Sequence, residues 1–62
     1  MAKKSYYAVA RGKVTGIFNN WEGCKASVTG YSGALYKGFS EQDLILAEQF
    51  LVENGAEVTY NY

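Results

Sequence analysis

The sequence predicts a small α+β fold, in which a three-stranded antiparallel sheet carries two helices in the order β-β-α-β-α. Short runs rich in tyrosine, valine and phenylalanine are typical of strands, and two stretches with helical apolar spacing interrupt them. The 62 residues are enough for a single domain spanning residues 1–62. We expect residues 1–5 to fray, whereas residues 56–62 fit either a short final strand or a frayed tail.

The first two predicted strands form a hairpin. Residues 5–11 (SYYAVAR) make the first strand and residues 14–18 (VTGIF) return as the second. Gly12-Lys13 lies between them with glycine first, as a two-residue type II′ turn prefers. Gly16 inside the second strand indicates a bulge or the close approach of another backbone segment.

A short helix is predicted from Trp21 to Val28, with Asn20 as its N-cap residue. Cys24 lies four residues before Val28, so both side chains should share the buried face of this helix. Gly30 follows the helix at the place where a left-handed backbone conformation often ends one. The helix should therefore pack on the sheet through its cysteine side.

A loop and a third strand precede the second predicted helix. The loop covers residues 31–33, and the strand covers residues 34–39 with an irregularity at Gly38. Ser40 should cap the second helix through a capping box, and the helix should end at residues 52–53. Its apolar side chains recur at helical spacing, with Leu46 widening the apolar face. The side chains that should supply the core against the sheet are Leu44, Ala47, Phe50 and Leu51.

Composition excludes several classes of function. The chain has no histidine, so a catalytic set that depends on histidine cannot be built. A single cysteine, Cys24, excludes an internal disulfide and, without histidine, the usual zinc sites. We therefore expect no cofactor, no metal site and no enzymatic activity. The single cysteine also favours a reducing, intracellular setting. No apolar run approaches the roughly 20 residues of a membrane span, so we expect no membrane partner.

The charges are segregated along the chain, although the formal net charge is zero. All six basic residues lie in residues 1–39 with a single acid, so this part carries +5. Residues 40–62 hold five acids and no base, so they carry −5. The asymmetry indicates a basic working surface on an acidic support. The alternative is an acidic helix that only increases solubility.

The remaining candidates for function are Trp21 and the segment 30–39. In this segment a Gly/Ser turn frees backbone amides, and an aromatic residue, Tyr36, precedes a cation, Lys37. Such groups suit contacts to a sugar-phosphate chain. The predicted hairpin turn supplies two further cations, Arg11 and Lys13. Each side chain also has an ordinary interpretation, since the two rings could lie in the core and the cations could simply be solvated.

Five segments carry a resemblance to a known domain: YYAV at 6–9, RGK at 11–13, TGIF at 15–18, WEGCKA at 21–26 and GALYKGF at 33–39. Together they resemble the N-terminal RNA/DNA hybrid-binding domain of cellular ribonuclease H, which is also found in caulimovirus viroplasmin proteins. The similarity runs from about Tyr6 to Leu51. It implies a three-stranded antiparallel sheet with two helices, in agreement with the elements predicted above.

The resemblance implies a non-catalytic, monomeric module that binds RNA/DNA hybrids through the minor groove without reading the sequence, and double-stranded RNA more weakly. Such a module normally tethers a ribonuclease H catalytic domain to its substrate and raises processivity. The chain would then be either a piece of such an enzyme or a free-standing copy of the module.

The resemblance also implies roles for individual residues. The positions matching Trp21 and Tyr36 pack against deoxyriboses of the DNA strand. The position matching Lys37 contacts DNA phosphate, with Tyr7 nearby. A last group contributes its backbone to the 2′-hydroxyls of the RNA strand, and it comprises Gly30, Ser32, Gly33 and Leu35.

The sequence departs from the family pattern at three positions where many members carry cations: Ala10, Leu35 and Gly38. Because phosphate contacts at these positions would be lost, we expect a lower affinity for nucleic acid. The alternative function is a protein–protein interaction module of the viroplasmin type. Its apolar contact patch would be formed by exposed tyrosines, namely Tyr6, Tyr31, Tyr60 and Tyr62.

Overall fold

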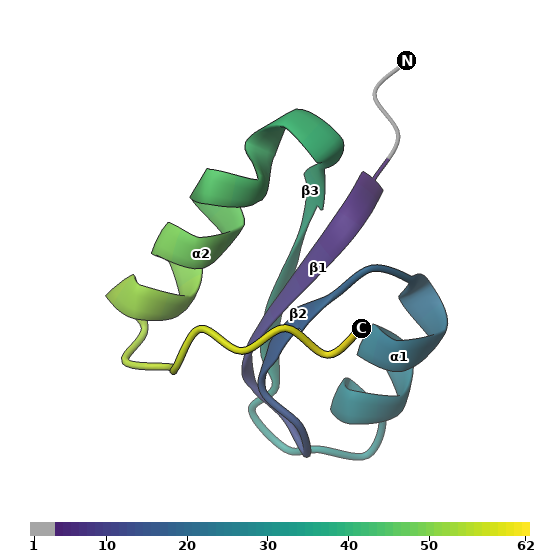
Figure 1. The fold of residues 1–62 in the computed structure, drawn as a ribbon. Helices are drawn as coiled ribbons and strands as arrows, with labels where there is room; N and C mark the ends of the chain where they lie inside the picture. Colours follow the sequence, from purple (N-terminus) through teal and green to yellow (C-terminus); the bar gives the residue numbers. More distant parts are fainter. Residues whose placement is uncertain (1–3) are drawn as a thin grey trace.

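A computed structural model of the chain describes residues 4–62. Its elements in order are β1 (Lys4–Arg11), β2 (Gly16–Phe18), α1 (Trp21–Val28), β3 (Leu35–Ser40), the 3-10 turn η1 (Glu41–Asp43) and α2 (Leu44–Glu53). The strands form one antiparallel sheet in the order β2-β1-β3, with α1 and α2 on opposite faces (Figure 1). The predicted α+β class and the order β-β-α-β-α are confirmed.

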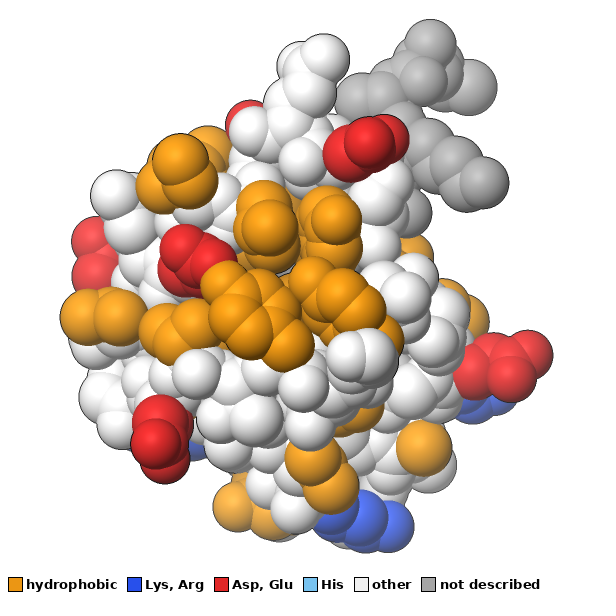
Figure 2. All heavy atoms as spheres, in the orientation of Figure 1, with side chains coloured by type: hydrophobic (Ala, Val, Ile, Leu, Met, Phe, Trp, Pro, Cys, Tyr) orange, Lys and Arg blue, Asp and Glu red, His pale blue; other side chains and the backbone are white. Residues whose placement is uncertain are grey.

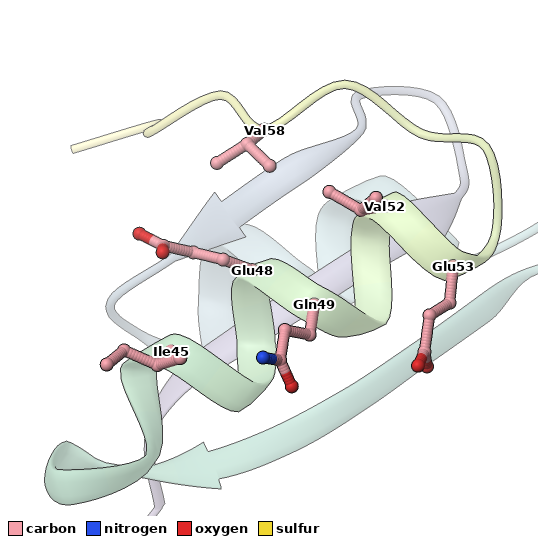
Figure 3. A pocket seen from close by; sticks show the side chains of 6 residues that line it. All are labelled: Ile45, Glu48, Gln49, Val52, Glu53 and Val58. Carbon is pink, nitrogen blue, oxygen red and sulfur yellow. The ribbon is translucent and has the colours of Figure 1, made fainter.

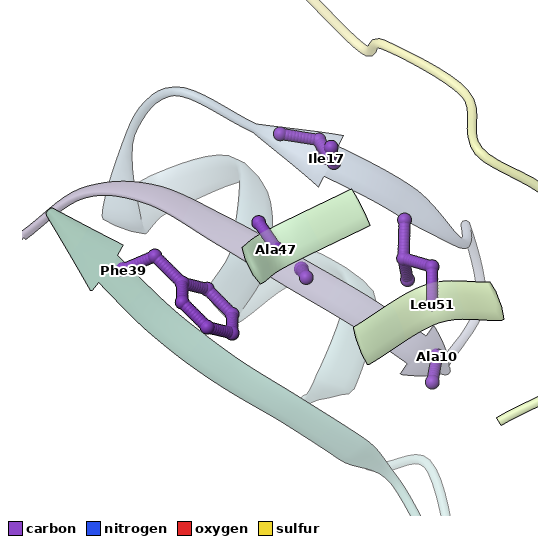
Figure 4. Packing of buried hydrophobic residues seen from close by; sticks show 6 residues of the cluster. Ala10, Ile17, Phe39, Ala47 and Leu51 are labelled. Carbon is purple, nitrogen blue, oxygen red and sulfur yellow. The ribbon is translucent and has the colours of Figure 1, made fainter. Parts of the chain in front are cut away.

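The central strand β1 divides the core into two halves, because successive side chains point to opposite faces of a sheet. Ala8 and Ala10 face α2, and their small side chains leave room for the helix. Val9 faces α1. The larger half of the core is completed by side chains from the other strands and from α2 (Figure 4), namely Ile17, Phe39, Ala47 and Leu51.

The smaller half of the core lies under α1. Cys24 is fully buried there with Val9 and Phe18, and Val28 packs against them from the same helix face. The predicted pairing of Cys24 with Val28 is therefore confirmed. Burial raises the pKa of the Cys24 thiol, so this side chain remains protonated at neutral pH and packs as a small apolar group.

The helix ends largely follow the sequence signals. The Asn20 side chain accepts a hydrogen bond from the Gly23 amide at 2.7 Å and caps α1 as predicted. The capping box at Ser40 was predicted wrongly, because the Ser40 hydroxyl donates to the Asp43 carboxylate at 2.9 Å instead of accepting from the backbone. The first turn is therefore η1, and α2 begins only after it. Leu46, which was expected to widen the apolar face of α2, is half exposed.

The hairpin between β1 and β2 differs from the prediction. Val9 pairs with Gly16, β1 continues to Arg11 beyond its pairing with β2, and residues 12–15 connect the two strands in place of a two-residue turn. This connection bonds to α1, since the Lys13 amide donates to the Ser27 carbonyl at 2.8 Å. These contacts compete with strand pairing, so the second strand begins at residue 16 and not at residue 14.

The predicted irregularity at Gly38 was also wrong. Gly38 pairs in register with Tyr7, and the register shifts lie between Lys4 and Tyr6 and between Val9 and Arg11. The irregular positions therefore belong to β1. Residues 1–3, part of the segment expected to fray, lie outside the described residues.

The chain after α2 runs in an extended conformation beside β2. The Ile17 amide donates to the Thr59 carbonyl at 2.7 Å, and the Asn61 amide donates to the Ile17 carbonyl at 2.8 Å. Only an isolated parallel bridge, between Ile17 and Tyr60, results. Gly16 makes this approach feasible, because its φ is 122° and a Cβ atom there would lie 2.4 Å from the Thr59 carbonyl oxygen. The close approach predicted at Gly16 is confirmed. No helix within residues 4–62 is long and apolar enough to cross a membrane.

Candidate nucleic-acid interface

Three aromatic side chains form a row on the α1 face of the sheet, and we call them the aromatic row: Tyr7, Trp21 and Tyr36. Trp21 lies between the other two, with its ring centroid 5.6 Å from that of Tyr7 and 6.1 Å from that of Tyr36. Trp21 is 44% exposed and Tyr36 is 42% exposed, so neither is a core residue. Tyr7 is partly buried and supports the row from the smaller core.

Local structure fixes each ring of the row. Asn20 caps α1 and thereby places Trp21 at the first helical position, beside the sheet. Tyr36 pairs with Val9, whose side chain packs under α1, so the period of two in a sheet places Tyr36 on that same face. Gly38 pairs with Tyr7 and faces the same way. The sequence therefore has a glycine where a longer side chain would extend along the row.

Lys37 lies on the opposite face from the row. It pairs with Ala8, which packs under α2, and its ammonium group is 5.5 Å from the centroid of the Phe39 ring. A cation above a ring in this way gains a modest electrostatic attraction. The structure therefore does not bring Lys37 together with Tyr36, although the two are neighbours in the sequence.

The loop between α1 and β3 presents backbone groups next to the row. The Tyr31 amide donates to the Val28 carbonyl at 3.1 Å, and the Ala34 amide donates to the Tyr31 carbonyl at 3.3 Å. The amides of Ser32 and Gly33 have no hydrogen-bond acceptor among residues 4–62. They are therefore open to a ligand.

Two glycines shape this loop through their backbone conformation. The φ angle is 74° at Gly30 and 76° at Gly33, in the left-handed region that side chains disfavour. A Cβ atom at either position would meet nothing within 4 Å, so it is the conformation and not crowding that favours glycine. The Leu35 side chain packs against the larger core, which leaves its backbone as the part that a ligand could contact.

The candidate cations of the hairpin lie at the same end of the sheet as the loop. Arg11 ends β1 and pairs with Leu35, the first residue of β3. Lys13 is exposed in the 12–15 connection. The exposed Lys25 adds a cation in the last turn of α1. Arg11, Lys13 and Lys25 thus lie at the loop end of the sheet and on α1, whereas Lys37 lies on the α2 face. The acids of the second half lie on η1, α2 and the segment that follows.

Ser27 holds the basic connection in place and was not identified from the sequence. It is 3% exposed, and its hydroxyl accepts from the Val14 amide at 3.0 Å and donates to the Val14 carbonyl at 2.5 Å. Gly12 lies close by, and a Cβ atom there would be 2.6 Å from the Ser27 hydroxyl oxygen. The only sequence signal is a serine three residues after Cys24, on the buried side of α1.

The described part of the chain offers nothing that resembles a metal centre. Across residues 4–62, no three side chains of histidine, cysteine, aspartate or glutamate come together in a way that could hold a metal ion. The surface of the aromatic row instead combines exposed rings, open amides and cations, which are groups that make contacts with sugars and phosphates.

Comparison with known proteins identifies the family. The family model described as the ribonuclease H1 N-terminal domain matches residues 5–51. Ribonuclease H of Saccharomyces cerevisiae is 43% identical over 58 residues, which are 94% of this chain and 16% of that protein. Ribonuclease H of Schizosaccharomyces pombe is 41% identical over 54 residues, which are 87% of this chain and 20% of that protein.

Animal relatives match a shorter part. Ribonuclease H1 of Mus musculus is 45% identical over 38 residues, which are 61% of this chain and 13% of that protein. The chain spans about a fifth or less of the length of these relatives. Because the family model covers most of the chain, including the aromatic row and the loop beside it, the chain belongs to the ribonuclease H1 N-terminal domain family.

Proposed function

We propose that the chain is a non-catalytic module that binds RNA/DNA hybrids along the minor groove, and double-stranded RNA more weakly. The observation that carries the proposal is the aromatic row beside the open amides of Ser32 and Gly33, in a member of the ribonuclease H1 N-terminal domain family. The exposed rings of Trp21 and Tyr36 and the open amides offer two different kinds of contact, which suits a duplex of two chemically different strands.

The division between the strands follows from their sugars. An aromatic ring can lie on a deoxyribose because no 2′-hydroxyl stands in its way, and Trp21 and Tyr36 expose the ring area for such a contact. An amide can donate to a 2′-hydroxyl oxygen, which only the RNA strand carries, and Ser32 and Gly33 expose such donors. A hybrid presents both sugars at once, whereas a DNA duplex lacks the hydroxyls.

Recognition of this kind does not depend on the base sequence. Sugars and phosphates are the same at every nucleotide, and only contacts to base edges distinguish sequences. The cations whose side chains the structure describes are Arg11, Lys13, Lys25 and Lys37. If three or four phosphate contacts come from these side chains, log K should fall with log salt with a slope of about −2 to −4.

The relatives are named ribonuclease H and are much longer than this chain. We infer that the module serves a ribonuclease H catalytic domain in the same protein. A module that stays on the hybrid keeps a tethered catalytic domain at a high effective concentration near its substrate, which raises processivity.

Tryptophan fluorescence tests the proposal directly, because Trp21 is the only tryptophan in the chain. Four nucleic acids of one sequence are titrated: RNA/DNA hybrid, double-stranded RNA, double-stranded DNA and single-stranded RNA. We expect the tightest binding to the hybrid, with a change in Trp21 emission that saturates. Equal affinity for all four, or no binding at low salt, would contradict the proposal.

A second candidate function, protein–protein interaction, is favoured by a cluster of tyrosines. The Tyr62 ring centroid is 6.0 Å from that of Tyr6 and 5.9 Å from that of Tyr60. Three of the four tyrosines suggested by the sequence therefore gather, whereas Tyr31 lies in the loop after α1. Figure 2 shows apolar side chains gathered at the centre of the face that carries α2 and the last residues of the chain.

A further inference from the structure

The outer surface of α2 is unusually apolar for a helix on a sheet. Ala47 and Leu51 are fully buried against the sheet, as expected for the inner face. The outer side nevertheless carries Ile45, Leu46 and Val52, which are 67%, 50% and 64% exposed. The outer face of a surface helix is normally polar. Ile45, Leu46 and Val52 depart from this pattern, so the outer side of α2 has an apolar part suited to burial under a partner.

An open groove of about 620 Å³ runs along this face, between α2 and the segment that follows it (Figure 3). Ile45 and Val52 from the helix and Val58 from the later segment give it an apolar lining. Ile45 and Val52 are seven residues apart, so the groove follows about two helical turns, or about 10 Å. Tyr60 borders it, because its hydroxyl donates to the carboxylate of Glu48.

The charge around the groove has one sign. Glu48 and Glu53 line it, and residues 40–62 contain no lysine or arginine. The groove on the other side of the helix is also bordered by Glu53, although Lys37 enters that one. An anionic ligand such as nucleic acid would be repelled from this face, whereas a cationic ligand would be attracted.

The groove is separate from the surface proposed for nucleic acid. The sheet lies between them, with α2 on one face and α1 and the aromatic row on the other (Figure 1). A partner in the groove and a duplex on the aromatic row can therefore be bound at the same time, and the inference that follows does not depend on the nucleic-acid proposal.

We propose that the groove between α2 and residues 56–60 docks a basic amphipathic helix of a partner protein. Apolar side chains of the partner at i, i+4 and i+7 fit against Ile45, Val52 and Val58, as in other complexes where a helix occupies a groove. Lysine or arginine side chains beside them pair with Glu48 and Glu53.

The test uses the isotopically labelled 62-residue chain and a probe peptide of about 14 residues, with leucines at i, i+4 and i+7 and lysines beside them. One control peptide has the same composition with the leucines spread around the helix, and a second has glutamate in place of lysine. We expect saturable amide shifts confined to α2 and residues 56–60 with the probe alone. The double variant Ile45→Gln, Val52→Gln should bind at least about tenfold more weakly. It replaces two exposed apolar side chains, which the peptide would bury, with polar ones.

The double variant should fold normally, since both positions are exposed, and its urea unfolding midpoint checks this. The variant Glu48→Gln, Glu53→Gln should reduce both the affinity and its dependence on salt. Four results would overturn the proposal: no saturation at about 1 mM peptide, equal binding of either control peptide, undiminished binding by the apolar double variant, or a dimer of the free chain that this variant abolishes. The last result would mean that a second copy covers the groove.

Discussion

Replacing Trp21 with alanine removes the central ring of the aromatic row. Its ring centroid lies 5.6 Å from that of Tyr7 and 6.1 Å from that of Tyr36, so the substitution also removes the contact that connects these two. Loss of one aromatic contact to nucleic acid costs about 1–3 kcal/mol. At about 1.4 kcal/mol per factor of ten, we expect hybrid binding to weaken by about 5- to 150-fold.

For Trp21 we expect a loss of affinity in the upper part of this range, for two reasons. The side chain is 44% exposed, so a large part of the ring can contact a ligand, and the ring also packs against Tyr36. Trp21→Phe retains a ring in the same place and should recover most of the affinity. The backbone amides of the neighbouring loop do not depend on this side chain, so discrimination of hybrid from DNA should persist in the alanine variant.

Fluorescence anisotropy with a labelled hybrid is the suitable assay, since the variant has lost its own fluorophore. Tyr62→Ala is a matched control, because this ring is 57% exposed but lies beside Tyr6 and Tyr60, away from the row. Urea unfolding confirms that each variant is folded. If folded Trp21→Ala binds as tightly as the parent, or if Tyr62→Ala weakens binding equally, the role of the aromatic row is refuted.

Three further substitutions test other parts of the account. Lys37→Ala should reduce the slope of log K against log salt by about one, because one phosphate contact is lost. An unchanged slope would mean that Lys37 contacts only the Phe39 ring and not phosphate. Ser27→Ala should cost about 1 kcal/mol of stability and speed hydrogen exchange at the Val14 amide, because this partly buried amide loses its acceptor; unchanged exchange would argue against this. Gly16→Ala should cost more than about 1 kcal/mol in urea unfolding, and more than the uncrowded control Gly55→Ala, because only Gly16 also meets the chain after α2.

Much of the fold could be predicted because local signals and tertiary packing agree. The first helix begins after Asn20 and ends at Val28 as predicted, since a capping side chain and a following glycine mark its two ends. The end of α2 at Glu53 followed from the same kind of signal. These features depend on residues that are close in the sequence.

The wide connection after β1 could not be predicted from local signals. Gly12-Lys13 is a good turn sequence, but the contacts that shape the connection come from Ser27, thirteen residues beyond Val14. The bridge between Ile17 and Tyr60 likewise joins distant parts of the chain. A local sequence pattern does not show which distant residues will come into contact, because the fold as a whole determines these contacts.

The three rings of the aromatic row were all singled out from the sequence, but their arrangement could not be predicted. Nothing in the sequence shows that Trp21 lies between Tyr7 and Tyr36, because the three rings come from three different elements. The separation of Tyr36 from Lys37 is different. It follows from the period of two in any strand, so it could have been foreseen from the sequence, although the two residues were grouped there as one contact surface.

The most direct test of the central claim is an amide shift map of the labelled chain with an RNA/DNA hybrid and, separately, with a DNA duplex of the same sequence. We predict that the hybrid shifts the Trp21 indole signal and the amides of Ser32 and Gly33, while the outer face of α2 remains unchanged and the DNA duplex gives weaker effects. Shifts centred on α2, or equal shifts with both duplexes, would contradict hybrid recognition by the aromatic row and its loop.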